Sequence, residues 1–180
     1  DGTPTINNNG DASLTIGKDF STNARVVAGA YAVASTEGTQ NDATGGKVYI
    51  EGDYDGTVYA GFSDGGTTSG NTAYIIGGVN AGKLELLGDN KDSGTSGATL
   101  AVTGNGNTLQ SIKRFDTITF DDVAFSNNAA LSVTSADLTG TSLTVNSLAG
   151  GQQYKLGDSV NLLSSANKIE ETAENISTGP

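Results

Sequence analysis

The sequence predicts an all-β fold, a right-handed parallel β-helix or β-solenoid with coils of roughly 26 residues. Three observations support this prediction. Apolar residues recur at positions 48/74/100 and 50/76/102, and glycine recurs at 52/78/104. Val, Ile, Leu and Tyr occur in short alternating runs bounded by Gly, Asn, Asp and Ser, as in strands joined by turns. Only 35% of the residues are apolar and 26 are glycine, a composition that suits stacked strands with polar turns.

Short apolar runs mark the expected strands, in order, at residues 14–16, 26–31, 48–52, 58–61, 74–78, 84–87, 100–104 and 115–120. Further short strands continue to residue 162, without the earlier strict phase. One glycine per coil would allow the backbone to turn sharply between faces. We therefore expect one solenoid domain over residues 1–165, followed by a polar C-terminal tail or short helix over residues 166–180.

The segment at residues 32–46 is predicted to be an inserted loop. The interval from Val26 to Val58 is 32 residues, whereas the later repeats use 26. Solenoids place such insertions on one face, which is often the binding face. Glu37, Asn41 and Asp42 are therefore candidate residues of a binding surface.

Charge and residue usage limit the classes of partner and reaction. The chain has 20 acidic and 9 basic residues, which argues against nucleic acid and anionic lipid as partners. It has no apolar run long enough to span a bilayer, so we expect no membrane insertion by this segment. Histidine and cysteine are absent, which removes the commonest general base and the thiol nucleophile. A noncatalytic protein without a cofactor is therefore predicted.

One segment has part of the pattern of a calcium-binding loop. Glu51, Asp53 and Asp55 occupy positions 1, 3 and 5, and Gly56 occupies position 6. The acid that should close such a loop falls on Phe62. A solvated turn is the favoured interpretation, and calcium is the alternative.

Other polar groups have a chemical and a structural interpretation. Paired acids such as Asp121 and Asp122 can supply acid and base for polysaccharide hydrolysis, but neighbours on a strand point to opposite faces. The oxygen-rich stretches 63–66 and 89–92 have the groups to bind a cation or a sugar, although such clusters mostly form turns. Turns are therefore the favoured interpretation in all three places.

Tyrosines in the first half of the chain are candidates for stacking on a glycan. Tyr49 and Tyr59 each lie between apolar residues expected to face inward, so their own rings should face outward. An outward aromatic ring offers an apolar face and a polar hydroxyl to a ligand. The alternative is that these rings lie over the corner of the solenoid.

Several segments resemble the passenger domains of bacterial autotransporter adhesins. The matching stretches are residues 48–52 (VYIEG), 56–62 (GTVYAGF), 74–78 (YIIGG), 112–120 (IKRFDTITF) and 139–145 (TGTSLTV). The resemblance covers residues 10–163 as a style of repeat. It implies an extracellular location on a Gram-negative cell surface and a role in adhesion or aggregation. Its implied partners are a host or bacterial surface glycan or protein, or other copies of the chain.

Three functions follow as hypotheses. The first is a noncatalytic cell-surface adhesin or stalk segment that mediates adhesion or self-association. The second is a subunit of a self-assembling extracellular fibre, in which residues 1–10 or the segment from residue 166 pair with the next copy. The third is a carbohydrate-active enzyme.

Overall fold

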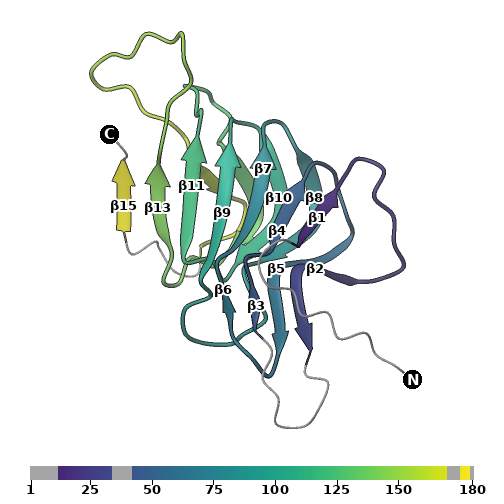
Figure 1. Cartoon of the computed structure of the whole chain (residues 1–180). Helices are drawn as coiled ribbons and strands as arrows, with labels where there is room; N and C mark the ends of the chain where they lie inside the picture. Colours follow the sequence, from purple (N-terminus) through teal and green to yellow (C-terminus); the bar gives the residue numbers. More distant parts are fainter. Residues whose placement is uncertain (1–11, 34–41, 170–174, 179–180) are drawn as a thin grey trace.

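The computed structural model is a β-solenoid, in which the chain passes in turn through two long parallel sheets (Figure 1). It describes residues 12–33, 42–169 and 175–178, and this part of the chain contains no helix. Strands of one long sheet alternate along the sequence with strands of the other, and the pairings between the described strands are parallel. The predicted all-β solenoid is therefore confirmed.

The larger sheet has seven strands, in the spatial order β1 (Ser13–Ile16), β4 (Lys47–Ile50), β7 (Asn71–Ile76), β9 (Ala98–Thr103), β11 (Thr117–Asp121), β13 (Ser142–Val145) and β15 (Asn175–Thr178). The second sheet has six, in the order β14 (Leu163–Ser165), β12 (Leu131–Ala136), β10 (Asn107–Lys113), β8 (Asn80–Leu87), β5 (Gly56–Asp64) and β2 (Val26–Val33). A two-stranded sheet joins β3 (Ala43–Thr44) to β6 (Thr68–Ser69). Residues about one coil apart in sequence therefore lie side by side.

Inward-facing side chains of both long sheets form one main hydrophobic core. In the larger sheet the register stacks five fully buried side chains, those of Ile16, Ile50, Ile75, Val102 and Phe120. Burying a side chain of this kind contributes about 1.5–3 kcal/mol, and alternation along each strand repeats the gain in every coil. The ladder of apolar residues is therefore the main source of stability.

The register inside the larger sheet corrects the alignment expected from the sequence. Val48 pairs with Ala73, not with Tyr74, and Ala73 pairs with Leu100, so the spacing is 25 residues and then 27. A shift of one residue turns a side chain to the opposite face. Tyr74 accordingly faces outward, and Ile76 is 56% exposed. Strand β7 has apolar residues on both faces, so its sequence is compatible with the expected register and with the observed one.

The same shift changes which glycines stack at the corner. Gly77, not Gly78, is the neighbour of Gly104, and its amide donates to the Thr103 carbonyl at 2.7 Å. Gly104 has a φ of 73°, and a Cβ added there would lie 3.3 Å from the Gly77 Cα. This corner therefore requires glycine for both backbone conformation and space.

A buried ion pair links successive coils. Asp89 follows β8 and is fully buried, and Arg114 Nε and Nη2 donate to its two oxygens at 2.9 and 3.1 Å. Thr68 Oγ1 donates to the same carboxylate at 2.9 Å, as does the Lys91 amide at 3.1 Å. The hydrogen bonds to Asp89 raise the pKa of Arg114 above its ordinary value. The stretch 89–92, considered as a cation or sugar site, thus contributes to contacts between coils.

Two segments depart from the simple coil. Strand β3 lies in the expected insertion at residues 32–46 and pairs with β6. In the segment 166–180, for which a tail or short helix was expected, residues 175–178 form β15, which pairs with β13 and extends the larger sheet (Figure 1). Residues 1–10, expected to pair with another copy in the fibre hypothesis, lie outside the described residues.

Candidate functional site

The outer face of the six-stranded sheet carries a groove of about 380 Å³, here called the sheet groove. Strand register builds it from two rows of side chains. One row is Tyr59, Leu87, Lys113 and Asp137, and the other is Thr57, Glu85, Ser111 and Ser135. Neighbouring side chains of one row come from adjacent strands about 4.8 Å apart. On any one strand, the members of the two rows are two residues apart and so face the same side of the sheet. The sheet groove therefore presents an apolar end and a row of hydrogen-bonding groups.

Weak contacts hold the charged side chains of the sheet groove. Thr57 Oγ1 donates to Glu85 Oε2 at 3.2 Å, and Lys113 Nζ lies 4.0 Å from Asp137 Oδ2. Partial burial acts to raise the pKa of Asp137, but hydrogen bonds from Thr139 and the charge of Lys113 hold that pKa below its ordinary value. Glu85 and the Lys113 ammonium remain exposed, so both can hydrogen-bond to a ligand.

Tyr59 lies at the apolar end of the sheet groove, and its ring faces outward, the direction that its sequence neighbours predicted. Val58 and Ala60 are fully buried, and the half-buried Tyr59 ring meets the Phe62 ring edge to face at 5.3 Å. The centroid of the Phe62 ring in turn lies 5.3 Å from that of the Tyr31 ring, and Tyr31 is 47% exposed. Three rings from two adjacent strands therefore form one aromatic patch.

Sequence reasoning missed Phe62 as part of this patch. Strict alternation from Tyr59 would turn Phe62 inward, but Ala60 and Gly61 are both buried and the alternation shifts between them. A Cβ at Gly61 would lie 2.1 Å from Asn71 Nδ2. Glycine inside a strand is the sequence signal for such an irregularity.

Tyr49 faces outward on the other sheet. Its ring stacks on that of Tyr74 at 5.1 Å with an interplanar angle of 11°, and the two residues are paired in the register of β4 and β7. Tyr49 and Tyr59 therefore belong to two different sheet faces and do not form one strip.

The loop candidates are only partly described. Glu37 and Asn41 lie outside the described residues. Asp42 is exposed, and its Oδ1 accepts hydrogen bonds from the Thr67 amide at 2.8 Å and the Thr67 hydroxyl at 2.9 Å. These bonds lower the pKa of Asp42 and tie it to the next coil.

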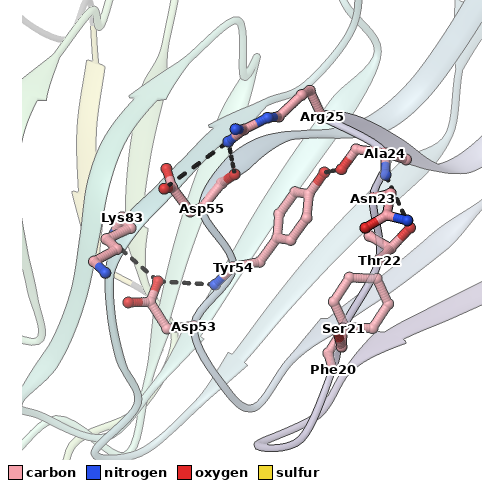
Figure 2. Close-up of a pocket in the computed structure, with 10 residues that line it drawn as sticks. All are labelled: Phe20, Ser21, Thr22, Asn23, Ala24, Arg25, Asp53, Tyr54, Asp55 and Lys83. Atoms are coloured by element: carbon pink, nitrogen blue, oxygen red, sulfur yellow. Dashed lines mark hydrogen bonds and ion pairs between the residues drawn. The ribbon is translucent and has the colours of Figure 1, made fainter.

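A second hollow, here called the loop pocket, has a volume of about 440 Å³ (Figure 2). Residues 20–25, residues 53–55 and Lys83 line it. It includes acids of the calcium-like stretch: Asp53 Oδ1 accepts hydrogen bonds from the amides of Tyr54 at 2.9 Å and Lys83 at 3.1 Å. Burial raises the pKa of Tyr54. Within the described ranges, no group of three or more acidic side chains is placed to hold a metal ion.

The paired acids lie where β11 ends, and Asp121 is its last residue. Asn146 Nδ2 donates to Asp121 Oδ2 at 3.3 Å, and the Asp122 amide donates to Ser147 Oγ at 2.9 Å. Asp122 has a φ of 54°, in the left-handed region that is uncommon for residues other than glycine and typical of turns. The turn interpretation therefore agrees with the geometry of Asp122, whereas Asp121 belongs to β11 and is paired with Thr103.

No protein-family model, curated protein sequence or solved structure matches this chain. Among the residues described, no helix has the length and apolar character needed to cross a bilayer. The candidate sites are therefore interpreted from their own chemistry.

Proposed function

We propose that this chain is a noncatalytic segment of a bacterial cell-surface adhesin or stalk, located outside the cell. It binds a host or bacterial surface glycan or protein, or other copies of itself. The observation that carries the proposal is the sheet groove, in which the aromatic patch at Tyr59 adjoins rows of hydroxyl and charged groups. The resemblance to autotransporter passenger domains supports the cell-surface location.

The chemistry of the sheet groove favours a glycan among these partners. A sugar ring has an apolar face of C–H groups and an edge of hydroxyls. Tyr59 and Leu87 supply an apolar surface for the first, and Glu85 with the serines of its row supplies acceptors and donors for the second. The rows run along the direction in which the coils stack, so an extended oligosaccharide fits better than a compact ligand.

A binding role agrees better with these groups than a catalytic one. Glu85 shares a hydrogen bond with Thr57 at the surface, and Asp137 is held ionised by Thr139 and Lys113. The pKa of Asp137 is lowered, whereas a general acid that must stay protonated near neutral pH needs a raised pKa. Assembly into a fibre remains the alternative function, and it predicts growth in particle length with protein concentration.

The test compares two tyrosine variants of the purified chain on an array of host and bacterial glycans. Tyr59→Ser should reduce binding at least about tenfold, the effect expected of losing a buried aromatic contact. Tyr49→Ser, on the other sheet, is the matched control and should bind as the unaltered chain does. Equal loss in both variants, or no loss in either, would contradict a role for the sheet groove. Thermal unfolding of each variant shows whether the fold is retained.

A further inference from the structure

We propose that the loop pocket is a second binding site, separate from the sheet groove, and that it takes one sugar residue bearing a carboxylate. The pocket lies where three coils meet, because its lining comes from the connections before β2 and β5 and from β8 (Figure 2). Its volume of about 440 Å³ lies within the range of small-molecule sites. The proposal stands on the pocket's own contacts and does not depend on the sheet groove.

The walls of the loop pocket are fixed before any ligand binds. Tyr54 Oη donates to the Ala24 carbonyl at 2.5 Å, which ties the loop at residues 20–25 to the next coil. The Phe20 ring meets the Tyr54 ring edge to face at 5.4 Å. The Thr57 amide donates to the Arg25 carbonyl at 2.9 Å. A preorganised pocket loses less conformational entropy on binding.

Lys83 reaches the pocket through an irregularity in β8. Leu109 and Ser111 of β10 pair with Ala81 and Glu85, so β8 has two more residues than its partner over this interval. Residues 82–84 of β8 lie opposite Gln110 alone, and Asp53 Oδ1 accepts a hydrogen bond from the Lys83 amide. Bulges of this kind redirect a side chain away from the regular ladder. Here the redirected side chain is a cation.

The loop pocket has more donors than internal acceptors. Within the part of the chain that the structure describes, the Lys83 ammonium and the side chains of Ser21 and Asn23 have no hydrogen-bond or ion-pair partner. Arg25 is 80% exposed, and its contacts with Asp55 are long, 3.4 Å to the carbonyl and 4.0 Å to the carboxylate. Two cations are therefore available to a ligand carboxylate, and the guanidinium fork matches that group.

Acceptors in the same pocket decide between a sugar and a simple anion. Asp53 uses Oδ1 for two amides, which leaves Oδ2 for a ligand, and the Asp55 carboxylate is 75% exposed. These two carboxylates accept hydrogen bonds from hydroxyl groups, which a sugar carries and inorganic sulfate does not. A ligand with one carboxylate and several hydroxyls satisfies both sets of groups. Uronic and sialic acids have this chemistry.

The test titrates the whole chain with methyl glucuronoside and with N-acetylneuraminic acid at physiological ionic strength, and follows backbone amide signals by NMR. Methyl glucoside and inorganic sulfate are the comparison ligands. We expect an acidic sugar to shift the amides of residues 21–25 and Lys83, and Lys83→Gln or Arg25→Gln to weaken binding at least about tenfold. Lys155→Gln, which removes an exposed cation that lines neither the loop pocket nor the sheet groove, is the matched control and should leave the affinity unchanged.

Three results would overturn the proposal: no shifts with either acidic sugar, binding of sulfate as tight as that of the sugars, or unchanged affinity in both Lys83→Gln and Arg25→Gln. The amide spectra of the variants report folding directly, so loss of binding with an intact spectrum is attributable to the removed cation. Failure of Tyr59→Ser to affect glycan binding would contradict the sheet groove and leave this site standing, so the two proposals fail separately.

Discussion

Arg114→Ala is expected to destabilise the solenoid strongly, because it leaves the Asp89 carboxylate buried without its cation. Asp89 is fully buried and the Arg114 side chain is only 14% exposed. Removing one partner of such a pair costs about 3–5 kcal/mol. Asp89 keeps its hydrogen bonds from Thr68 and the Lys91 amide, so we expect a loss of about 3 kcal/mol in the free energy of unfolding. A single domain typically has about 5–15 kcal/mol in total.

Arg114→Ala also removes the hydrogen bond from Arg114 Nη1 to the Gly94 carbonyl at 2.8 Å, but it adds no backbone strain. Arg114 has a φ of 65°, and alanine is as strained as arginine in that conformation, so the backbone contribution cancels. Arg25→Ala is the control, because its contact with Asp55 is 4.0 Å long and both side chains are at least 75% exposed. Loss of such an exposed pair should cost less than about 1 kcal/mol.

Urea unfolding followed by circular dichroism measures the decrease in the free energy of unfolding in Arg114→Ala and in Arg25→Ala. The double variant Asp89→Asn with Arg114→Ala removes the stranded charge and should be more stable than Arg114→Ala alone. A loss in Arg114→Ala no greater than that in Arg25→Ala, or a double variant less stable than the single one, would refute the reasoning.

Two further predictions concern a corner and a titrating acid. Gly104→Ala should lower the free energy of unfolding in urea by about 1–2 kcal/mol or more, because φ is 73° and the added Cβ would lie 3.3 Å from Gly77 Cα. Gly150→Ala, with no atom within 4 Å of its added Cβ, should leave it nearly unchanged, and equal effects would contradict the steric argument. The pKa of Asp137 is lower when folded than its ordinary 3.8, so the unfolded state binds more protons there as the pH falls, and its contribution to stability decreases below about pH 4 and is lost through the folded pKa. The melting temperature of Asp137→Asn should therefore fall less steeply over that range than that of the unaltered chain, and parallel curves would be the contrary result.

Fold class was predictable from the sequence because the core repeats. Ile50 and Val102 share the ladder that the spacing indicated, and Phe120 extends it, since an inward row must be apolar in every coil. The outward direction of Tyr49 and Tyr59 followed from the same alternation. These features depend only on which residues lie beside one another in the chain.

Buried polar residues were not predicted, although they had a local signal. Asn71 and Asn107 are fully buried at the starts of β7 and β10, and their side-chain amides bridge backbone groups of adjacent coils. Each follows a glycine with positive φ, at Gly70 and Gly106. A Gly-Asn pair at the start of a strand is thus the sequence signal for both buried positions. The pattern was not recognised because asparagine beside glycine is usually a turn residue exposed to solvent.

The candidate sites were less predictable because they depend on coil length. In the larger sheet, Leu100 and Ile118 are partners only 18 residues apart, whereas Leu14 and Val48 are partners 34 apart. No single period gives both alignments. Glu85 and Ser111 share a row of the sheet groove only because β8 has two more residues than β10 over this interval. The same irregularity places Lys83 in the lining of the loop pocket. Inserting or deleting residues in one coil changes which side chains share a row while the apolar ladder continues. In this solenoid the repeat therefore determines the fold, and the departures from it determine the surfaces available to a ligand.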